Sequence, residues 1–344
     1  MSLLSPFESR ALTFRAASLL ERRAMLDGRA LPATDRSERI GALLRTWLQA
    51  YSPGRADALE ARLAWDGLGL DDLQAVVADV TELPDDLPIA TWVPWLSEAL
   101  DHATGVARDI STDLSGLPER GLFLDGDRPP FLDVLAPFAR AAEHRLAAAA
   151  PAWTTLATTV RDAFRRQVLR ELATVTELGW LARFEAWRDG AASRDGEPYH
   201  AFARAQLRGG LIEHWLAYPV AARHAATIAG TWCTATAELL ARLDADRAAI
   251  EARTGALGEW IDVTPALSDP HDGRRRVAIL TFAGGRVVYK PRDLRPRRRV
   301  VGLARPGRAR PACRRRRRRC GRSCARATAG RRSPRRRPSR RARR

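Results

Sequence analysis

Lysine is nearly missing from this chain. One lysine, Lys290, stands against 57 arginines among the 344 residues. The two cations differ in chemistry, because arginine presents a planar fork of five donors and lysine a compact point charge on a flexible stem. A coding bias against lysine could leave a single lysine in the chain by chance. Alternatively, lysine is retained at this position because its function requires an ammonium group. The surroundings of Lys290 decide between these two explanations.

Cysteine is also scarce. Of the four cysteines, only Cys233 precedes residue 295, and Cys313, Cys320 and Cys324 follow it. This low density excludes a disulfide-stabilised secreted scaffold and favours a reducing compartment. Cys233 is interpreted as a small buried apolar residue. The three later cysteines have no fourth ligand nearby, which argues against a zinc site among them.

Long apolar runs are absent too. The longest uncharged stretches, such as "LAAAAPAWTTLATTV", are about 15 residues long, rich in threonine and interrupted by Pro151. A membrane-spanning helix needs about 20 mostly apolar residues. At the N-terminus, Glu8 and Arg10 come too early for a secretory signal. We therefore expect a soluble, cytoplasmic protein.

Acidic residues are absent from the last 50 positions. Residues 295–344 contain 24 arginines and no acidic or aromatic residue, so this segment carries a charge of +24. Residues 1–294 hold 34 basic and 40 acidic residues, which gives −6. The basicity of the chain thus belongs to an arginine-rich tail, and the rest is an ordinary, mildly acidic protein. With so little apolar content the tail is expected to be disordered.

Helical patterns dominate residues 1–255, the first predicted domain. The letters "SPFE" at residues 5–8 form a capping box with proline at the first helical position. In "SERIGALLRTWLQAY" the apolar residues recur at intervals of three and four, which predicts one buried helical face. Tyr218 and Pro219 predict another helix start. His214 and His224 have no acidic or cysteine partner at ligand spacing, so they are interpreted as structural.

The pattern changes in residues 256–294, the second predicted domain. "EWIDVTPAL" and "RRVAILTFAGGRVVYKPR" are rich in residues that favour strands, and Gly284 and Gly285 separate two apolar runs as a hairpin turn does. The return strand is predicted from Val287 to Lys290, and Pro291 closes it because proline cannot donate to a ladder. Along the strand before the turn, residues 278, 280 and 282 fall on one face and residues 277, 279 and 281 on the other.

A polar loop, "SDPHDGRR", precedes the hairpin and holds Asp269 and His271. In a sheet of this order, a loop between the first two strands can fold over a nucleotide, and a lysine on the third can reach its α- and β-phosphates. Lysine suits that role because it brings a point charge to phosphate oxygens. Taken alone, Asp-x-His is more typical of an Asp-Pro turn with an exposed histidine, and Lys290 of a solvent-facing cation at a strand end.

The segment "LSDPHDGRRRVAILTFAGGRVVYKPRDL" resembles the dehydratase domain of class II (LanM-type) lanthipeptide synthetases. Those enzymes carry an acidic-x-His loop, a hairpin and a Tyr-Lys-Pro-Arg strand at this spacing. Upstream, "RLAWDGL", "LRGGLIEHWLAYPVAAR" and "TWCTATAELLARLDADRAAI" are similar to the helical segments that precede that strand. The resemblance covers roughly residues 1–294 and is strongest around Lys290.

The resemblance implies an α+β fold, in which a large helical region is followed by the antiparallel small lobe of a lipid-kinase-like domain. It implies phosphorylation of serine and threonine in a precursor peptide with ATP and Mg²⁺, and then elimination of the phosphate to leave dehydroalanine or dehydrobutyrine. Lys290 matches the lysine that engages the nucleotide phosphates, and Arg292 is expected to assist it. Asp269 and His271 match the loop pair of the elimination step, in which an imidazole can move protons near neutral pH.

The resemblance ends near Leu294, and the third predicted domain is the tail at 295–344. In the family, the catalytic-loop base, the metal-binding carboxylates and the zinc-dependent cyclase domain all follow the lysine strand. We therefore expect a fragment that is inactive alone and binds no zinc. Arg, Pro, Ala and Gly make up 40 of the last 50 residues. Their codons begin with two G or C bases, which favours a frameshift near codon 295 over a genuine basic arm.

Two functions of different classes stay open. The first is lanthipeptide dehydration, with a precursor peptide as partner. The second is a non-enzymatic module that binds a peptide, or that binds nucleic acid through the tail by counterion release. Arms of the second kind usually carry aromatic residues for stacking on bases, and the tail has none. A salt-dependent DNA affinity that is lost on deletion of residues 295–344 would favour the binding module.

Overall fold

In the computed structural model of the chain, the residues described are 3–26, 55–69, 83–111, 113–124, 126–190 and 198–291, with isolated positions between 41 and 49. The chain divides into two units, Met1–Arg292 and Asp293–Arg344, and the residues described all lie in the first. Most of the helix predicted from "SERIGALLRTWLQAY" lies outside the described residues, and so does the whole tail at 295–344.

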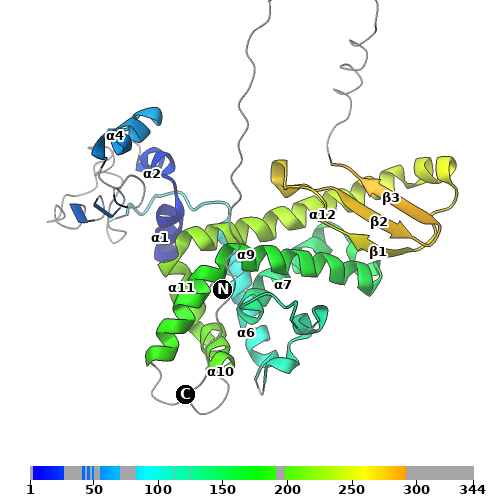
Figure 1. The fold of residues 1–344 in the computed structure, drawn as a ribbon, viewed down its shortest axis with the longest axis horizontal. Helices are drawn as coiled ribbons and strands as arrows, with labels where there is room; N and C mark the ends of the chain where they lie inside the picture. Colours follow the sequence, from blue (N-terminus) through cyan, green and yellow to red (C-terminus); the bar gives the residue numbers. More distant parts are fainter. Residues whose placement is uncertain are drawn as a thin grey trace, which may run out of the picture. The chain divides into compact units, whose positions relative to one another are not determined.

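Helices precede strands along the chain (Figure 1). The helices are α1 (Pro6–Ala16), α2 (Leu19–Leu26), α4 (Ala56–Trp65), α6 (Val93–Asp109), α7 (Leu132–Ala149), α8 (Ala152–Thr155), α9 (Thr158–Gly190), α10 (Pro198–Ala205), α11 (Leu211–Ala217) and α12 (Pro219–Thr254). Short turns of helix are η2 (Leu114–Gly116), η3 (Pro118–Leu122), η4 (Gln206–Gly210) and η5 (Asp272–Arg274). The strands are β1 (Trp260–Thr264), β2 (Ala278–Phe282) and β3 (Gly285–Tyr289). The prediction of a mostly helical region followed by a small antiparallel sheet is confirmed.

Two predicted helix starts are confirmed. At the start of α1 the Ser5 hydroxyl accepts a hydrogen bond from the Glu8 backbone N–H at 3.2 Å, and the Glu8 carboxylate accepts one from the Ser5 N–H at 2.8 Å. This reciprocal pair satisfies two donors that a helix end leaves without intrahelical partners. Further along, α12 begins at Pro219, where the missing N–H of proline is no loss.

The core lies where α6, α7, α9 and α12 pack against one another. At its centre the His214 ring stacks on Trp180, with ring centroids 3.4 Å apart and planes inclined by 8°. His214 is fully buried, and Cys233 of α12 is buried as well. Both residues therefore serve packing, as the sequence predicts. Among the described residues, no helix combines the length and apolar character needed to cross a bilayer.

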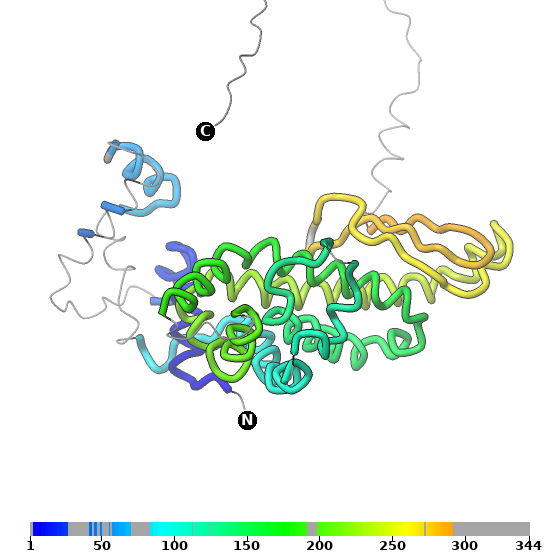
Figure 2. The backbone as a smooth tube through the Cα atoms, turned by 60° about the horizontal axis from the view of Figure 1, so that its bottom comes forward, coloured from blue at the N-terminus to red at the C-terminus, as the bar shows by residue number. Residues whose placement is uncertain are grey.

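The sheet has the order β1-β2-β3 and both pairings are antiparallel. Ala278, Leu280 and Phe282 form its buried face, as the alternation of the sequence predicts. Figure 2 shows the sheet lying beside one end of α12. The Arg247 guanidinium of α12 sits 5.7 Å from the centroid of the Phe282 ring and donates to the carbonyl of Gly258 at 2.6 Å. The sheet is therefore seated on the long helices by its apolar face.

The return strand differs slightly from its prediction. β3 begins at Gly285, before the predicted Val287, because Gly285 already pairs with Phe282 across the turn. It ends at Tyr289, so Lys290 is the first residue after the strand. The hairpin is confirmed, but its turn is formed by Ala283 and Gly284, one residue before the predicted pair Gly284 and Gly285. A β-carbon at residue 284 would lie 2.1 Å from the carbonyl oxygen of Ala256, so this tight approach of two backbones requires glycine.

Candidate functional site

The predicted site residues lie at one end of the sheet. Thr264, the last residue of β1, pairs with Ile279, and Ala278, the first of β2, pairs with Tyr289 at the end of β3. The loop of residues 265–277 therefore begins and ends at the edge of the sheet where β3 ends. Lys290, the residue after β3, lies at this same end of the sheet. Figures 1 and 2 show this loop and the end of β3 side by side.

The loop at 265–277 is ordered by its own hydrogen bonds. The Leu267 N–H donates to the carbonyl of Val277 at 2.9 Å, and the Val277 N–H donates to the Ser268 hydroxyl at 3.1 Å. Further out, His271 and Arg275 exchange two backbone hydrogen bonds of 3.0 and 2.9 Å around the η5 turn. These bonds satisfy the polar groups of a segment that belongs to no regular sheet, and they fix the backbone that carries His271.

Two of the three consecutive arginines of the loop bind one carboxylate of α9. The Arg274 guanidinium donates to Glu171 Oε2 at 2.5 and 3.1 Å, and Arg276 lies 3.3 Å from Oε1 of the same carboxylate. The Glu171 side chain is 14% exposed. Charge-assisted bonds of this kind are stronger than bonds between neutral groups, and they anchor the loop to the helical core.

The third arginine connects the loop to the end of β3 through α12. Arg275 Nε donates to Glu238 Oε2 at 2.5 Å, and Glu238 also pairs with Arg242 one helical turn later. Arg242 in turn donates to the carbonyl of Pro291 at 3.3 Å. One carboxylate of α12 thus holds both the loop and the residue that follows Lys290.

The four predicted site residues differ in their surroundings. Lys290 is exposed, and within the described part of the chain its ammonium has no hydrogen-bond or ion-pair partner. Asp269 is exposed, and its carboxylate makes no hydrogen bond to His271, which is half-buried. Arg292 lies outside the described residues. The fold therefore brings the loop pair and Lys290 to one end of the sheet without a hydrogen bond between Lys290 and either loop residue.

A small cavity lies under the loop. It measures about 40 Å³ and is lined by Glu171, Trp232, Tyr289 and the three loop arginines, among others. Burial is the main cause that raises the pKa of the Tyr289 hydroxyl, which is therefore neutral at physiological pH. On this measure about 10–15 Å³ is enough for one water molecule, so the cavity holds a few water molecules and is too small for a nucleotide. Lys290 is exposed outside this cavity, at the same end of the sheet.

Sequence reasoning missed the anchors of the loop. Glu171 and Arg274 are 103 positions apart, and Glu238 and Arg275 are 37 apart, so no local spacing relates them. It also missed a cluster of Glu98, His102 and His144 in the helical region. For that cluster one local signal exists, because residues 98 and 102 are four apart on a helix and so share a face.

Comparison with known families matches this part of the chain. Residues 218–308 match the DUF4135 family. The family is described as a domain of unknown function, and the domain is found in LanM-type lanthipeptide synthetases. The described part of the DUF4135 match contains α12, the three strands, the loop at 265–277 and Lys290. No curated protein matches the chain. The match is consistent with the lanthipeptide resemblance at the level of family.

Proposed function

We propose that the sheet and the loop at 265–277 form the nucleotide-phosphate-binding part of a lanthipeptide dehydratase. The substrate is a precursor peptide whose serine and threonine residues are phosphorylated with ATP and then dehydrated. The observation that supports this proposal is the exposed ammonium of Lys290, which has no partner among the described residues and lies at the same end of the sheet as the anchored loop of Asp269 and His271.

The distribution of paired and unpaired cations assigns different roles to the basic residues. Arg274, Arg275 and Arg276 are already bound to carboxylates of α9 and α12, so they position the loop. Lys290 has no such partner among the described residues, and its charge remains available for phosphate oxygens. A lysine at residue 290 presents a compact ammonium group with three rotatable donors, which binds phosphate oxygens as a point charge.

The chemistry requires two steps. In the first, the hydroxyl oxygen of serine or threonine attacks the γ-phosphorus of ATP, the bond to the β-phosphate oxygen breaks, and ADP and a proton leave. In the second, a base removes the Cα proton and the Cβ–O bond breaks. Inorganic phosphate departs, and a double bond remains between Cα and Cβ. Lys290 acts in the first step by binding the α- and β-phosphates, and His271 supplies an imidazole for the proton of the second. Asp269 lies two residues before His271 in the same loop, where the family resemblance pairs the two residues for the elimination step.

Mg²⁺ is the metal ion that such chemistry uses with ATP, and it neutralises the charge of the phosphates. Glu171 and Glu238, the two helical carboxylates of this site, are both occupied by arginines. They therefore do not fit as ligands of this ion.

Binding of a fluorescent ATP analogue to the full chain tests the proposal. Because the arginine tail attracts any polyphosphate, the titration is run at about 0.15 M salt, and every variant retains the tail. Lys290→Ala is expected to weaken the affinity about tenfold or more, the effect of losing a charge-assisted hydrogen bond. Arg286→Ala is the matched control, because Arg286 is an exposed cation on β3 that pairs with Thr281 near the hairpin turn. Equal affinities of the wild type and Lys290→Ala would overturn the proposal.

A further inference from the structure

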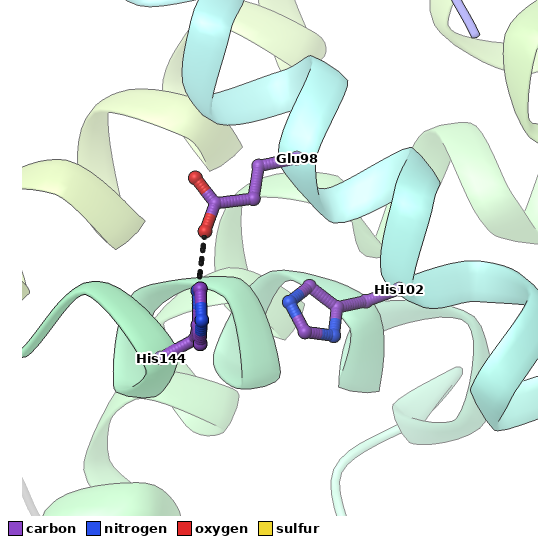
Figure 3. Close-up of side chains that lie close together, drawn as sticks. All are labelled: Glu98, His102 and His144. Atoms are coloured by element: carbon purple, nitrogen blue, oxygen red, sulfur yellow. Dashed lines mark hydrogen bonds and ion pairs between the residues drawn. The ribbon is translucent and has the colours of Figure 1, made fainter. Parts of the chain in front are cut away.

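Three potential metal ligands meet in the helical region, outside the site described above. Glu98 and His102 lie one turn apart on α6, and His144 lies on α7, which packs alongside. Figure 3 shows the three side chains directed into the space between the two helices. One ligand atom from each residue lies within 4.8 Å of the other two. We propose that Glu98, His102 and His144 bind a divalent transition-metal ion of the zinc class.

The donor set fits this class of ion. Two imidazoles and one carboxylate are a set that zinc uses in sites that keep a fourth position open. Zinc bonds of about 2.0–2.2 Å in a tetrahedron place the ligand atoms about 3.3 Å apart. His144 Nδ1 and Glu98 Oε1 form a hydrogen bond of 3.0 Å, so a metal ion would replace the proton between two atoms that already lie near the required separation. Side-chain rotation can bring the remaining ligand atoms to the same separation, because the His144 side chain is 71% exposed and has room to move.

A second layer of contacts orients the carboxylate. Arg145 donates to Glu98 Oε2, while Oε1 faces His144. The Arg145 guanidinium also lies 4.1 Å from the ring centroid of Trp95, which itself packs on Gly230 of α12. Partners that fix the outer oxygen of a ligating carboxylate are a common feature of metal sites. Ion-pair clusters share this arrangement, and metal titration distinguishes them from a metal site.

An ion can reach the three residues from solvent. They line an open groove of about 860 Å³ whose other walls include Ser9 of α1 and Ile89. The groove leaves space for a water molecule or another small ligand at the fourth position. The proposed site is separate from the nucleotide site and from any cyclase zinc, because its ligands come from α6 and α7 alone.

Metal binding by the full chain tests the proposal. For this test the full chain is prepared with the substitutions Cys313→Ser, Cys320→Ser and Cys324→Ser, because free thiols of the tail also bind zinc ions. It is stripped with a chelator and titrated with Zn²⁺ by calorimetry and with Co²⁺ by visible spectroscopy. We expect one equivalent of metal and a cobalt spectrum of nitrogen and oxygen ligands without a thiolate charge-transfer band.

Substitutions assign the site. His102→Ala and His144→Ala are each expected to weaken zinc binding by more than the roughly 10–100-fold that loss of an outer partner costs. His224→Ala is the matched control, because His224 is an exposed histidine of α12 far along the chain from the cluster. His144 is itself exposed, so its replacement leaves the fold intact, and circular dichroism verifies this for each variant. The proposal is overturned if no saturable binding of one equivalent occurs, or if His144→Ala binds as the wild type does.

Discussion

Arg275 of the loop donates to Glu238 of α12 across 2.5 Å, and this contact joins the candidate site to the longest helix of the described chain. Because Glu238 also pairs with Arg242, which holds the carbonyl of Pro291, the loop and the end of β3 depend on the same carboxylate. The positions of His271 and Lys290 are therefore coupled through a residue that belongs to neither strand nor loop.

Glu238→Gln should loosen this end of the sheet. The side chains of Glu238, Arg275 and Arg242 are 21%, 32% and 45% exposed, so solvent screens the network and its loss should cost only about 1 kcal/mol. The change should appear as faster amide hydrogen exchange in residues 265–277, by about fivefold, with the core unaffected. Glu213→Gln, which breaks an exposed pair with Arg183, is the control and should leave exchange in the loop as it is. If amide exchange in the loop were the same in Glu238→Gln as in the wild type, the loop would be stabilised by its own hydrogen bonds and not by Glu238.

His214 should make the fold sensitive to acid. Burial, aided by the charge of Arg183, lowers its pKa to about 3, from the ordinary value of 6.5. Below pH 6.5 the unfolded chain binds a proton at His214, whereas the folded chain does not. The stability of the fold with respect to His214 is therefore complete above pH 6.5 and is lost as the pH falls towards 3. Between pH 7.5 and pH 5 the loss amounts to about 2 kcal/mol.

Urea unfolding at the two pH values measures this contribution. In His214→Phe the aromatic ring is retained, while the two ring nitrogens, which have no hydrogen-bond partner in the fold, are removed. The variant should lose about 2 kcal/mol less than the wild type between pH 7.5 and pH 5. Identical pH dependence in both proteins would mean that His214 is protonated in the folded state.

Gly284→Ala should damage the hairpin that leads to Lys290. A β-carbon at this position would lie 2.1 Å from the carbonyl oxygen of Ala256, which is backbone and cannot move aside cheaply. The expected loss of unfolding free energy is about 1–3 kcal/mol, the range of overpacking in a tight site. Gly121→Ala is the control, because a β-carbon added to Gly121 would meet no other atom within 4 Å. Equal stability of the two variants in urea would contradict the close approach.

Local patterns predicted the sheet and its connections well. The hairpin at Gly284, the alternation of Ala278, Leu280 and Phe282, and the start of α12 each depend on residues that are neighbours in sequence. Such features are specified by turn chemistry and by the period of the strand, which a single sequence displays directly. The small shift of the β3 boundaries is within the usual uncertainty of element ends.

Contacts between segments that are distant in the chain could not be predicted from the sequence. The sequence grouped Asp269, His271 and Lys290 through the order of strands and loop and through the family resemblance, and the register of the strands shows that they share one end of the sheet. Arginine side chains are abundant throughout the chain, so nothing marks Arg274 and Arg275 as the ones that pair with Glu171 and Glu238. The choice depends on how α9 and α12 pack beneath the loop.

Labelling with an acyl-phosphate derivative of ATP tests the central claim most directly. This reagent transfers its acyl group to a lysine amine that lies beside bound phosphates, and Lys290 is the one lysine side chain of the sequence. The account predicts acylation of Lys290 in the full chain, detected by mass spectrometry of its peptides and suppressed by excess ATP. An acyl phosphate without adenosine should label the same residue much more weakly. Labelling that is equal with both reagents and unaffected by ATP would show that Lys290 is only an exposed cation at the end of a strand.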